Sequence, residues 1–283
     1  MQLHKLEYLK CPDCPTSKMI YAQNAFTCSS CSKVFGIDNE KLSFVNFTGS
    51  LTYDSLDAVK SFFKKYPQLY VFLRRFFAPV FFERDLHNFV KENNPSEKVV
   101  VHLGSGNTRF HKDILNLDII GYGNVNIIAD ITKIPLQSGS VDAVILDSVL
   151  EHVKQPDVVT KEVLRILKPQ GNLFVSIPFM MGFHACPDDY YRWTEEGAKI
   201  LLQDFKILKL KAEGGPTSAL LWIFQEWLSL VLSFGIKPLH IFWYIFLMVT
   251  TWPFKYLDIV LNKYEYQNKI SSAFIIICKK NDQ

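Results

Sequence analysis

Short apolar runs alternate with amphipathic stretches between residues 96 and 212, a pattern typical of a parallel α/β sheet. We interpret the apolar runs as strands. They are Lys98–Leu103, Leu115–Ile120, Val125–Ile128, Val141–Leu146 and Asn172–Ile177.

Helices are expected between and after these strands. One should start at about Ser148, and Asp157–Leu167 forms a second, amphipathic helix that stops at the turn Lys168–Gly171. Thr194 can cap a third helix that runs to about Gln203.

The C-terminal part contains a long apolar segment between two strand-like runs, Phe205–Lys211 and Ser272–Lys279. We expect the two runs to pair as a β-hairpin, so that residues 216–262 form an insertion within it. Residues 238–254 contain no Asp, Glu, Lys or Arg and would span roughly 25 Å as a helix. This suits a re-entrant or interfacial membrane hairpin or a single transmembrane segment; a buried lid or a dimer helix is the alternative.

Aromatic and basic residues are interleaved in a second unusual segment, residues 51–95, which we interpret as a helical connector. A basic, aromatic amphipathic helix fits an anionic membrane surface. An ordinary helix that covers the core is an equal alternative.

Composition limits the class of protein. The chain has 283 residues, of which 48% are hydrophobic and 21% charged, so we expect a globular protein with one core domain and additions. The formal net charge of +3 gives no general argument for nucleic-acid binding. The first residues contain no apolar run, so we expect no secretory signal peptide and a cytoplasmic protein with reduced cysteines.

Two CxxC pairs, Cys11 with Cys14 and Cys28 with Cys31, lie thirteen residues apart. Two such pairs supply four thiolates for one tetrahedral Zn²⁺, and metal binding would stabilise a segment too small to fold alone. Disulfides or free thiols are the alternative. The segment resembles the zinc ribbons of small methyltransferase-activator proteins and of some bacterial methyltransferases, so we assign residues 1–50 to a zinc ribbon.

A glycine loop follows the first predicted strand. Gly104, Ser105 and Gly106 form a GxG turn, where glycines allow the backbone to approach a ligand closely. Asp118 ends the next strand, where its carboxylate can accept both ribose hydroxyls of a cofactor. Asp130 follows the third strand and can meet the adenine amine, with Ile131 against the ring.

The run from about Val99 to Pro178 resembles class I S-adenosylmethionine-dependent methyltransferases of the type 11 group. The resemblance includes Leu150–Val153 and Glu162–Gly171, and it implies a Rossmann-like sheet with helices on both faces. It also places Asp147, after the fourth strand, in the cofactor site. The methyltransferase domain would cover residues 96–283, with S-adenosylmethionine and zinc as cofactors.

Two features depart from the family pattern. His102 stands where family members usually have Asp or Glu, and only eleven residues separate Gly106 from Asp118. The first crossover helix must therefore be short or irregular.

The loop after the fifth strand contains the candidate base. His184 could deprotonate a hydroxyl, and His152 is a second candidate, although a pocket-wall role is favoured for it. The segment through Arg192 resembles methyltransferases of cell-surface polysaccharide pathways, which implies a sugar or glycan hydroxyl as acceptor.

The sequence thus predicts O-methylation of a sugar, glycan or lipid-linked acceptor at the cytoplasmic membrane face. The alternatives are an RNA methyltransferase and a non-catalytic, cofactor-binding membrane scaffold. A homo-oligomer stays open, and a nucleic-acid partner is not expected.

Overall fold

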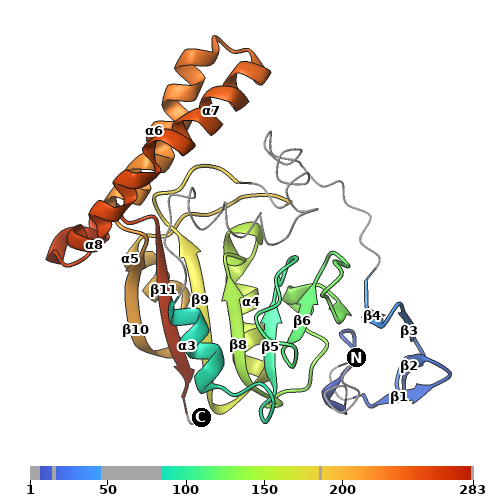
Figure 1. The fold of residues 1–283 in the computed structure, drawn as a ribbon. Coiled ribbons are helices and arrows are strands. Elements are labelled where there is room, and N and C mark those ends of the chain that lie inside the picture. Colours follow the sequence, from blue (N-terminus) through green and yellow to red (C-terminus); the bar gives the residue numbers. More distant parts are fainter. Residues whose placement is uncertain (1–6, 15–16, 46–83, 185–186, 282–283) are drawn as a thin grey trace.

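The computed structural model describes residues 7–14, 17–45, 84–184 and 187–281 (Figure 1). Residues 51–83 of the predicted aromatic and basic connector lie outside these ranges. Its last part is helix α3 (Arg84–Glu92).

The strands form one mixed sheet in the order β1-β2-β3-β4-β7-β6-β5-β8-β9-β11-β10. Its central strands are parallel to one another, whereas β11 is antiparallel to both β9 and β10. The central strands are β5 (Val100–Leu103), β6 (Leu115–Asp118), β7 (Ile127–Ile128), β8 (Val141–Asp147) and β9 (Leu167–Pro178). All five predicted strands of this region are therefore confirmed, with shorter bounds for the first three.

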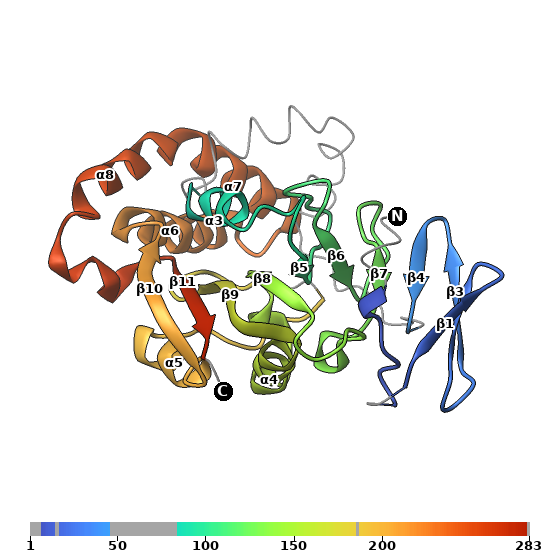
Figure 2. The ribbon, with the colours of Figure 1, turned by 90° about the horizontal axis from the view of Figure 1, so that it is seen from below.

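Alternating side chains of the strands pack on the two faces of the sheet. One core contains α3, whose Phe89 ring lies 5.6 Å from that of Phe174 in β9. The opposite core contains α4 (Pro156–Ile166), with Val159 and Val163 packed on the other face of the sheet. Helix α5 (Glu195–Leu201) lies on the same side as α4, and Thr194 caps it by accepting from Gly197 N. Figure 2 shows the two layers.

Two connections at the carboxyl ends of the strands differ from regular βαβ units. No helix connects β5 to β6, which agrees with the short first crossover that the spacing predicts. The prediction of a helix from Ser148 is wrong. A single 3₁₀ turn, η3 (Leu150–His152), follows β8, and α4 starts only at Pro156. Proline fits the first helical turn and disfavours helical backbone in the residue before it, so the helix begins there.

The N-terminal strands are continuous with the central sheet. β1 (Met19–Ala22), β2 (Ala25–Cys28), β3 (Val34–Asp38) and β4 (Lys41–Ser43) form an antiparallel meander, and β4 pairs in parallel with β7. Before them, Lys10 N donates to the Pro135 carbonyl at 3.1 Å. The cysteine-containing segment is therefore joined to the sheet edge by backbone hydrogen bonds.

A helical hairpin is inserted between β10 (Phe205–Glu213) and β11 (Ala273–Lys280), as predicted. Its arms are α6 (Pro216–Ser233) and α7 (Lys237–Thr251), and it projects away from the sheet (Figure 1). The chain returns through η4 (Trp252–Leu257), α8 (Asp258–Leu261) and η5 (Glu265–Ile270). Within the described part of the chain, one helical run, Lys237–Leu261, is long and apolar enough by length and composition to cross a bilayer.

Asp258 fixes the base of this hairpin. Its buried carboxylate accepts hydrogen bonds from Gly215 N, Thr217 N, Ser218 N and Ser218 Oγ at 2.6–3.1 Å. These backbone groups are the first, otherwise unpaired, donors of α6, where a negative charge is favourable.

The hairpin has polar residues inside and apolar residues outside. The buried face of α6 includes Gln225, Ser229 and Ser233, and Gln225 Nε2 donates to Thr251 Oγ1 of α7 at 2.8 Å. Many large apolar side chains point outward instead, although Leu221 of α6 and Tyr244 and Leu247 of α7 are buried. The exposed ones in the two arms and their turn are Leu220, Ile223, Phe224, Trp227, Leu230, Val231, Phe234, Ile236, Phe242, Phe246 and Val249.

Candidate active site and cysteine cluster

A cavity of about 670 Å³ opens at the carboxyl ends of the central parallel strands. All seven predicted cofactor-binding residues line it. They are Gly104, Ser105, Gly106, Asp118, Asp130, Ile131 and Asp147. Of the two candidate bases, His152 lines the cavity and His184 lies next to it, with the two rings edge to face at 5.1 Å.

The glycine loop has left-handed backbone at both glycines. Gly104 has a φ of 63°, and an added Cβ would lie 2.5 Å from Cγ1 of Val149. Gly106 has a φ of 52°, and an added Cβ would meet no atom within 4 Å. Gly104 is therefore required for packing, whereas Gly106 leaves open space in the cavity wall where a cofactor can approach.

Asp118 joins the glycine loop to the second strand. Its Oδ2 accepts from Gly106 N at 2.7 Å, and its Oδ1 accepts from Ile120 N at 2.8 Å. Burial raises the pKa of this carboxyl group. The hydrogen bonds hold the carboxylate at the cavity wall, where its remaining lone pairs can accept from a ligand.

Asp130 and Ile131 lie on the next turn along the edge. Asp130 Oδ1 accepts from Thr132 N and from Thr132 Oγ1, both at 2.8 Å, and so caps η2 (Ile131–Lys133). Ile131 is buried beside it. Asp147 is the last residue of β8 and reaches the same cavity.

His102 is a buried histidine in the cavity wall. Burial lowers its pKa to about 3, so the ring is neutral at physiological pH. Neither ring nitrogen has a hydrogen-bond partner, and the ring lies 5.0 Å from that of Phe110. A neutral imidazole can accept a hydrogen bond from a ligand group in the cavity.

Another side of the cavity is built by η3 and the loop after β9. Nε2 of His152 and Nε2 of His184 lie 3.9 and 3.8 Å from the same atom, Oε1 of Glu151. Below His184, Asp189 accepts two hydrogen bonds from Arg192, at 2.5 and 2.6 Å. This salt bridge between Asp189 and Arg192 fixes the conformation of the loop after β9.

Burial determines the protonation of this cluster. It lowers the pKa of both His152 and His184, so both rings are neutral near pH 7 and can accept a proton. It raises the pKa of Glu151 to about 8.

Sequence reasoning missed Glu151 as a member of this cluster. The signal was its position directly before His152, in a segment already assigned to the site. In the structure Glu151 Oε1 lies 3.8 Å from Nε2 of His184, and the His152 ring lies 5.1 Å from the His184 ring.

The loop after β9 also contacts the helical hairpin. The His184 ring lies 6.4 Å from the Trp222 ring of α6, and an added Cβ on Gly182 would lie 2.8 Å from Trp222 Nε1. The candidate base therefore lies between the cavity and the hairpin.

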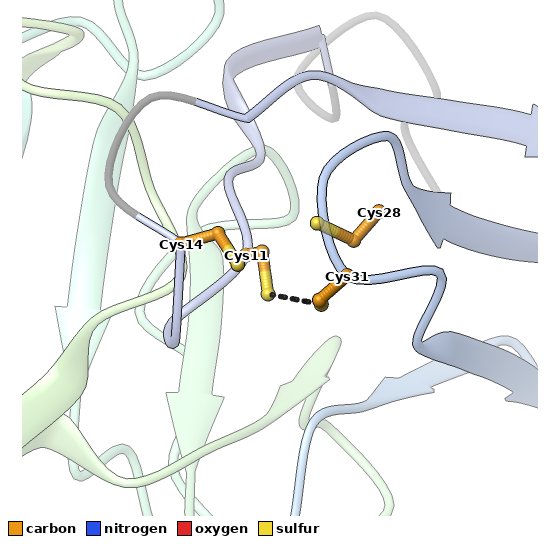
Figure 3. A group of neighbouring side chains, drawn as sticks. All are labelled: Cys11, Cys14, Cys28 and Cys31. Atoms are coloured by element: carbon orange, nitrogen blue, oxygen red, sulfur yellow. Dashed lines mark hydrogen bonds between the residues drawn. The ribbon is translucent and has the colours of Figure 1, made fainter.

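The four N-terminal cysteines converge from two loops (Figure 3). Their sulfur atoms all lie within 4.8 Å of one another, and Sγ of Cys11 lies 3.8 Å from Sγ of Cys31. Four thiolates at about 2.3 Å from Zn²⁺ in a tetrahedron would be about 3.8 Å apart. Ser30 N also points to the Cys28 sulfur at 3.4 Å, so the donor set and its geometry fit zinc.

A parallel sheet with a glycine turn after one strand and carboxylates after the next two defines an α/β nucleotide-cofactor protein. Residues 101–175 match the family described as "Methyltransferase domain". Over these residues the chain thus contains a methyltransferase domain, and it is built on a Rossmann-like sheet.

Solved methyltransferase structures are similar at low identity. The Burkholderia thailandensis 1,6-didemethyltoxoflavin-N1-methyltransferase has 11% identity and a TM-score of 0.44, over 93% of this chain and 99% of that one. The Haemonchus contortus phosphoethanolamine N-methyltransferase 2 has 13% identity and a TM-score of 0.45, over 81% and 60%. A Methanosarcina mazei S-adenosylmethionine-dependent methyltransferase has 12% and 0.43, over 71% and 99%. No curated protein matches the sequence.

Proposed function

We propose that this methyltransferase methylates a hydroxyl oxygen of a lipid-linked sugar or glycan at the cytoplasmic face of a membrane. The observation that supports this acceptor is the contact between the His184 loop and a hairpin whose outer surface is apolar. An acceptor with a lipid anchor would reach the cavity from the bilayer surface in this arrangement.

The cofactor would occupy the cavity beside the glycine loop. Asp118 would accept the ribose hydroxyls, and Asp130 would accept from the adenine amine, with Ile131 against the ring face. Ser105, Asp147 and the open face of Gly106 would border the remaining part of the cofactor. S-adenosylmethionine supplies an already activated methyl group, so the protein contributes mainly positioning.

His184 would take the proton of the acceptor hydroxyl. Its ring is neutral at physiological pH because burial lowers its pKa, and its Nε2 is aimed at the shared space with His152 and Glu151. His152 lines the cavity and would orient the hydroxyl. Proton removal by one positioned base contributes about 10²–10⁴-fold to a rate.

The hairpin would insert into the lipid. A soluble helix buries its apolar stripe, whereas α6 buries Gln225, Ser229 and Ser233 and exposes Trp227 and Leu230. Small and polar residues between helices with apolar residues outside are the arrangement of helices packed in a bilayer. The 18 residues of α6 extend about 27 Å, close to the thickness of the hydrocarbon core.

Zinc on Cys11, Cys14, Cys28 and Cys31 would have a structural role. Four protein ligands leave no open position for a substrate. The metal would hold the loops that β4 joins to the edge of the sheet.

Vesicle flotation tests the membrane part of this function. Leu230→Asp puts a charge on the outer face of α6, which costs about 2.5–3.5 kcal/mol in lipid and should weaken vesicle binding roughly 100-fold. Leu208→Asp, at a similarly exposed leucine of β10, is the matched control and should bind as the wild type does. Full-length protein that stays in solution beside anionic vesicles would contradict membrane insertion.

Methyl transfer tests the acceptor. Membranes from cells that lack the protein are incubated with full-length enzyme and S-adenosylmethionine labelled in its methyl group. Label should enter the lipid-linked glycan fraction, and His184→Ala should slow this by about 10²–10⁴-fold with unchanged cofactor affinity. Label in RNA instead would establish the alternative substrate, and a fully active His184→Ala enzyme would remove the base assignment.

A further inference from the structure

Glu151, His152 and His184 bring three metal-binding groups together beside the cofactor cavity. One carboxylate oxygen and two imidazole nitrogens all lie within 4.8 Å of one another. Both Nε2 atoms lie 3.8–3.9 Å from Oε1 of Glu151. This cluster is far along the chain from the four cysteines and has a different ligand chemistry.

Glu151 is a buried carboxyl group that no other residue of the described part of the chain reaches with a hydrogen bond. Its side chain is fully buried, and neither Oε1 nor Oε2 accepts from another described residue. A buried carboxylate left without a donor or a cation is costly. A cation between Glu151 and the two rings would remove this cost.

A hydrogen bond on the other nitrogen orients the His152 ring, and Asp189 holds the backbone of His184. Nδ1 of His152 lies 2.5 Å from the Asp188 carbonyl oxygen, so Nδ1 donates its proton there and the lone pair is on Nε2. Nδ1 of His184 lies 3.8 Å from Oδ2 of Asp189, which is too long for a hydrogen bond; that oxygen instead accepts from the His184 backbone N at 2.8 Å, and Arg192 holds the carboxylate with two hydrogen bonds. Histidines that bind metal ions commonly donate their other ring N–H to a carbonyl or a carboxylate, as His152 does here, and a contraction of the His184 loop would bring its Nδ1 within reach of Asp189.

The separations between the ligand atoms need only a small decrease to fit a bound ion. Ligand atoms at about 2.0–2.2 Å from a divalent ion lie about 3.0–3.5 Å apart. The two Nε2 atoms would each have to move toward Oε1 by less than about 1 Å. His184 lies on a loop and 27% of its side chain is exposed, so it can make this movement.

We propose that Glu151, His152 and His184 bind a divalent transition-metal ion with three protein ligands. Two imidazoles and one carboxylate suit zinc, cobalt, manganese or iron(II) and leave positions open. Since His152 lines the cavity, an open position there would bind an acceptor hydroxyl and lower its pKa. With Nε2 of His184 bound to the ion, that ring would no longer take the proton, which would leave to water instead. This role rests on the proposed function, whereas the binding of the ion does not.

Cobalt(II) titration of full-length protein that holds one equivalent of zinc, in detergent, tests the site, because the four thiolates of the cysteine cluster take that zinc. One equivalent of cobalt should bind, with the visible absorption of nitrogen and oxygen ligands and without the charge-transfer absorption of thiolates. Asp189→Asn should weaken binding about 10- to 100-fold, and Glu151→Gln should weaken it further. His111→Asn is the matched control, because His111 also lies 3.8 Å from an aspartate but outside this cluster, and it should bind as the wild type does.

If Glu151→Gln does not fold, His184→Asn on the partly exposed loop decides the same question. Zinc-loaded wild-type protein that binds no further equivalent of cobalt would overturn the proposal, as would binding that neither variant weakens. Methyl transfer without a second ion would overturn this inference and leave the proposed function in place. A protein that binds the ion at this site but transfers no methyl group would support the metal site and contradict the proposed function.

Discussion

Alanine substitutions at the two glycines of the cofactor loop should have opposite effects on folding and on binding. Both residues have left-handed backbone, which costs alanine about 1–2 kcal/mol. At Gly104 the new Cβ would also lie 2.5 and 2.8 Å from the two methyl groups of Val149, and relieving such overpacking costs about 1–3 kcal/mol more. At Gly106 the Cβ would enter open space in the cavity wall.

We therefore expect Gly104→Ala to lower the free energy of unfolding by roughly 2–5 kcal/mol and Gly106→Ala by only about 1–2 kcal/mol. Val149 is β-branched and stiff, so it cannot move aside cheaply. In a Val149→Ala background, Gly104→Ala should cost only the backbone term, which makes a double-mutant cycle the appropriate control. Gly106→Ala should instead lose most of its affinity for S-adenosylmethionine, because its methyl group occupies the cofactor space.

Urea denaturation without cofactor measures the first effect, and calorimetric titration with S-adenosylmethionine measures the second. Equal destabilisation by the two substitutions, or no coupling between Gly104 and Val149, would refute the packing argument. Wild-type cofactor affinity in Gly106→Ala would show that the cofactor does not approach this loop.

Three further predictions concern buried polar groups. His102 stays neutral in the folded protein but becomes charged in the unfolded chain below about pH 6.5, so its contribution to stability is present above pH 6.5 and is lost as the pH falls toward 3. Between pH 7 and 5 the free energy of unfolding should fall by about 2 kcal/mol, as measured by urea denaturation, and this loss should disappear in His102→Gln. Asp118→Ala should weaken S-adenosylmethionine binding about 10- to 100-fold in calorimetry, since ribose hydroxyls and Gly106 N lose their acceptor. Metal analysis of reduced protein should find one zinc on the cysteine cluster, and Cys11→Ser should lose it while the core still binds cofactor.

Each of these three predictions has an outcome that would contradict it. An acid-induced loss of stability that is identical in wild type and His102→Gln would show that this ring does not remain neutral. Unchanged binding in Asp118→Ala would place the ribose elsewhere. Reduced protein without zinc would refute the ribbon assignment.

The central sheet could be predicted because its strands are buried on both faces. Val141–Leu146 and Asn172–Ile177 are nearly continuous apolar runs. A strand that is buried on both faces has this pattern, so it can be recognised from the sequence. The cofactor residues could be predicted for a related reason. In a parallel sheet, residues that follow successive strands meet at one edge, and Gly104, Asp118 and Asp130 do so.

The turn after β8 could not be predicted, because local helix propensity does not contain the tertiary contacts of Glu151 and His152. The 3₁₀ geometry buries Glu151 and lets His152 reach the Asp188 carbonyl, 36 positions further along the chain. The pairing of the cysteine segment with the central sheet could not be predicted either, because it also depends on tertiary contacts. Lys41–Ser43 is too short to be recognised as a strand alone, and it exists because it pairs with β7.

The apolar insertion shows a different limit. Its composition predicts contact with lipid or burial, and both fit the same residues. The choice depends on which face of each helix is covered, and only the structure places Ser229 and Ser233 inside and Trp227 and Leu230 outside.

Mass spectrometry of glycans and lipids from cells with and without this protein is the most direct test of the proposed methylation. Lipid-linked glycans should be heavier by one CH₂ group only when the wild-type protein is present, and Gly106→Ala, which folds but should not bind cofactor, should leave them unmodified. Identical glycan and lipid masses in the presence and absence of the wild-type protein would contradict methylation of a lipid-linked hydroxyl at the membrane.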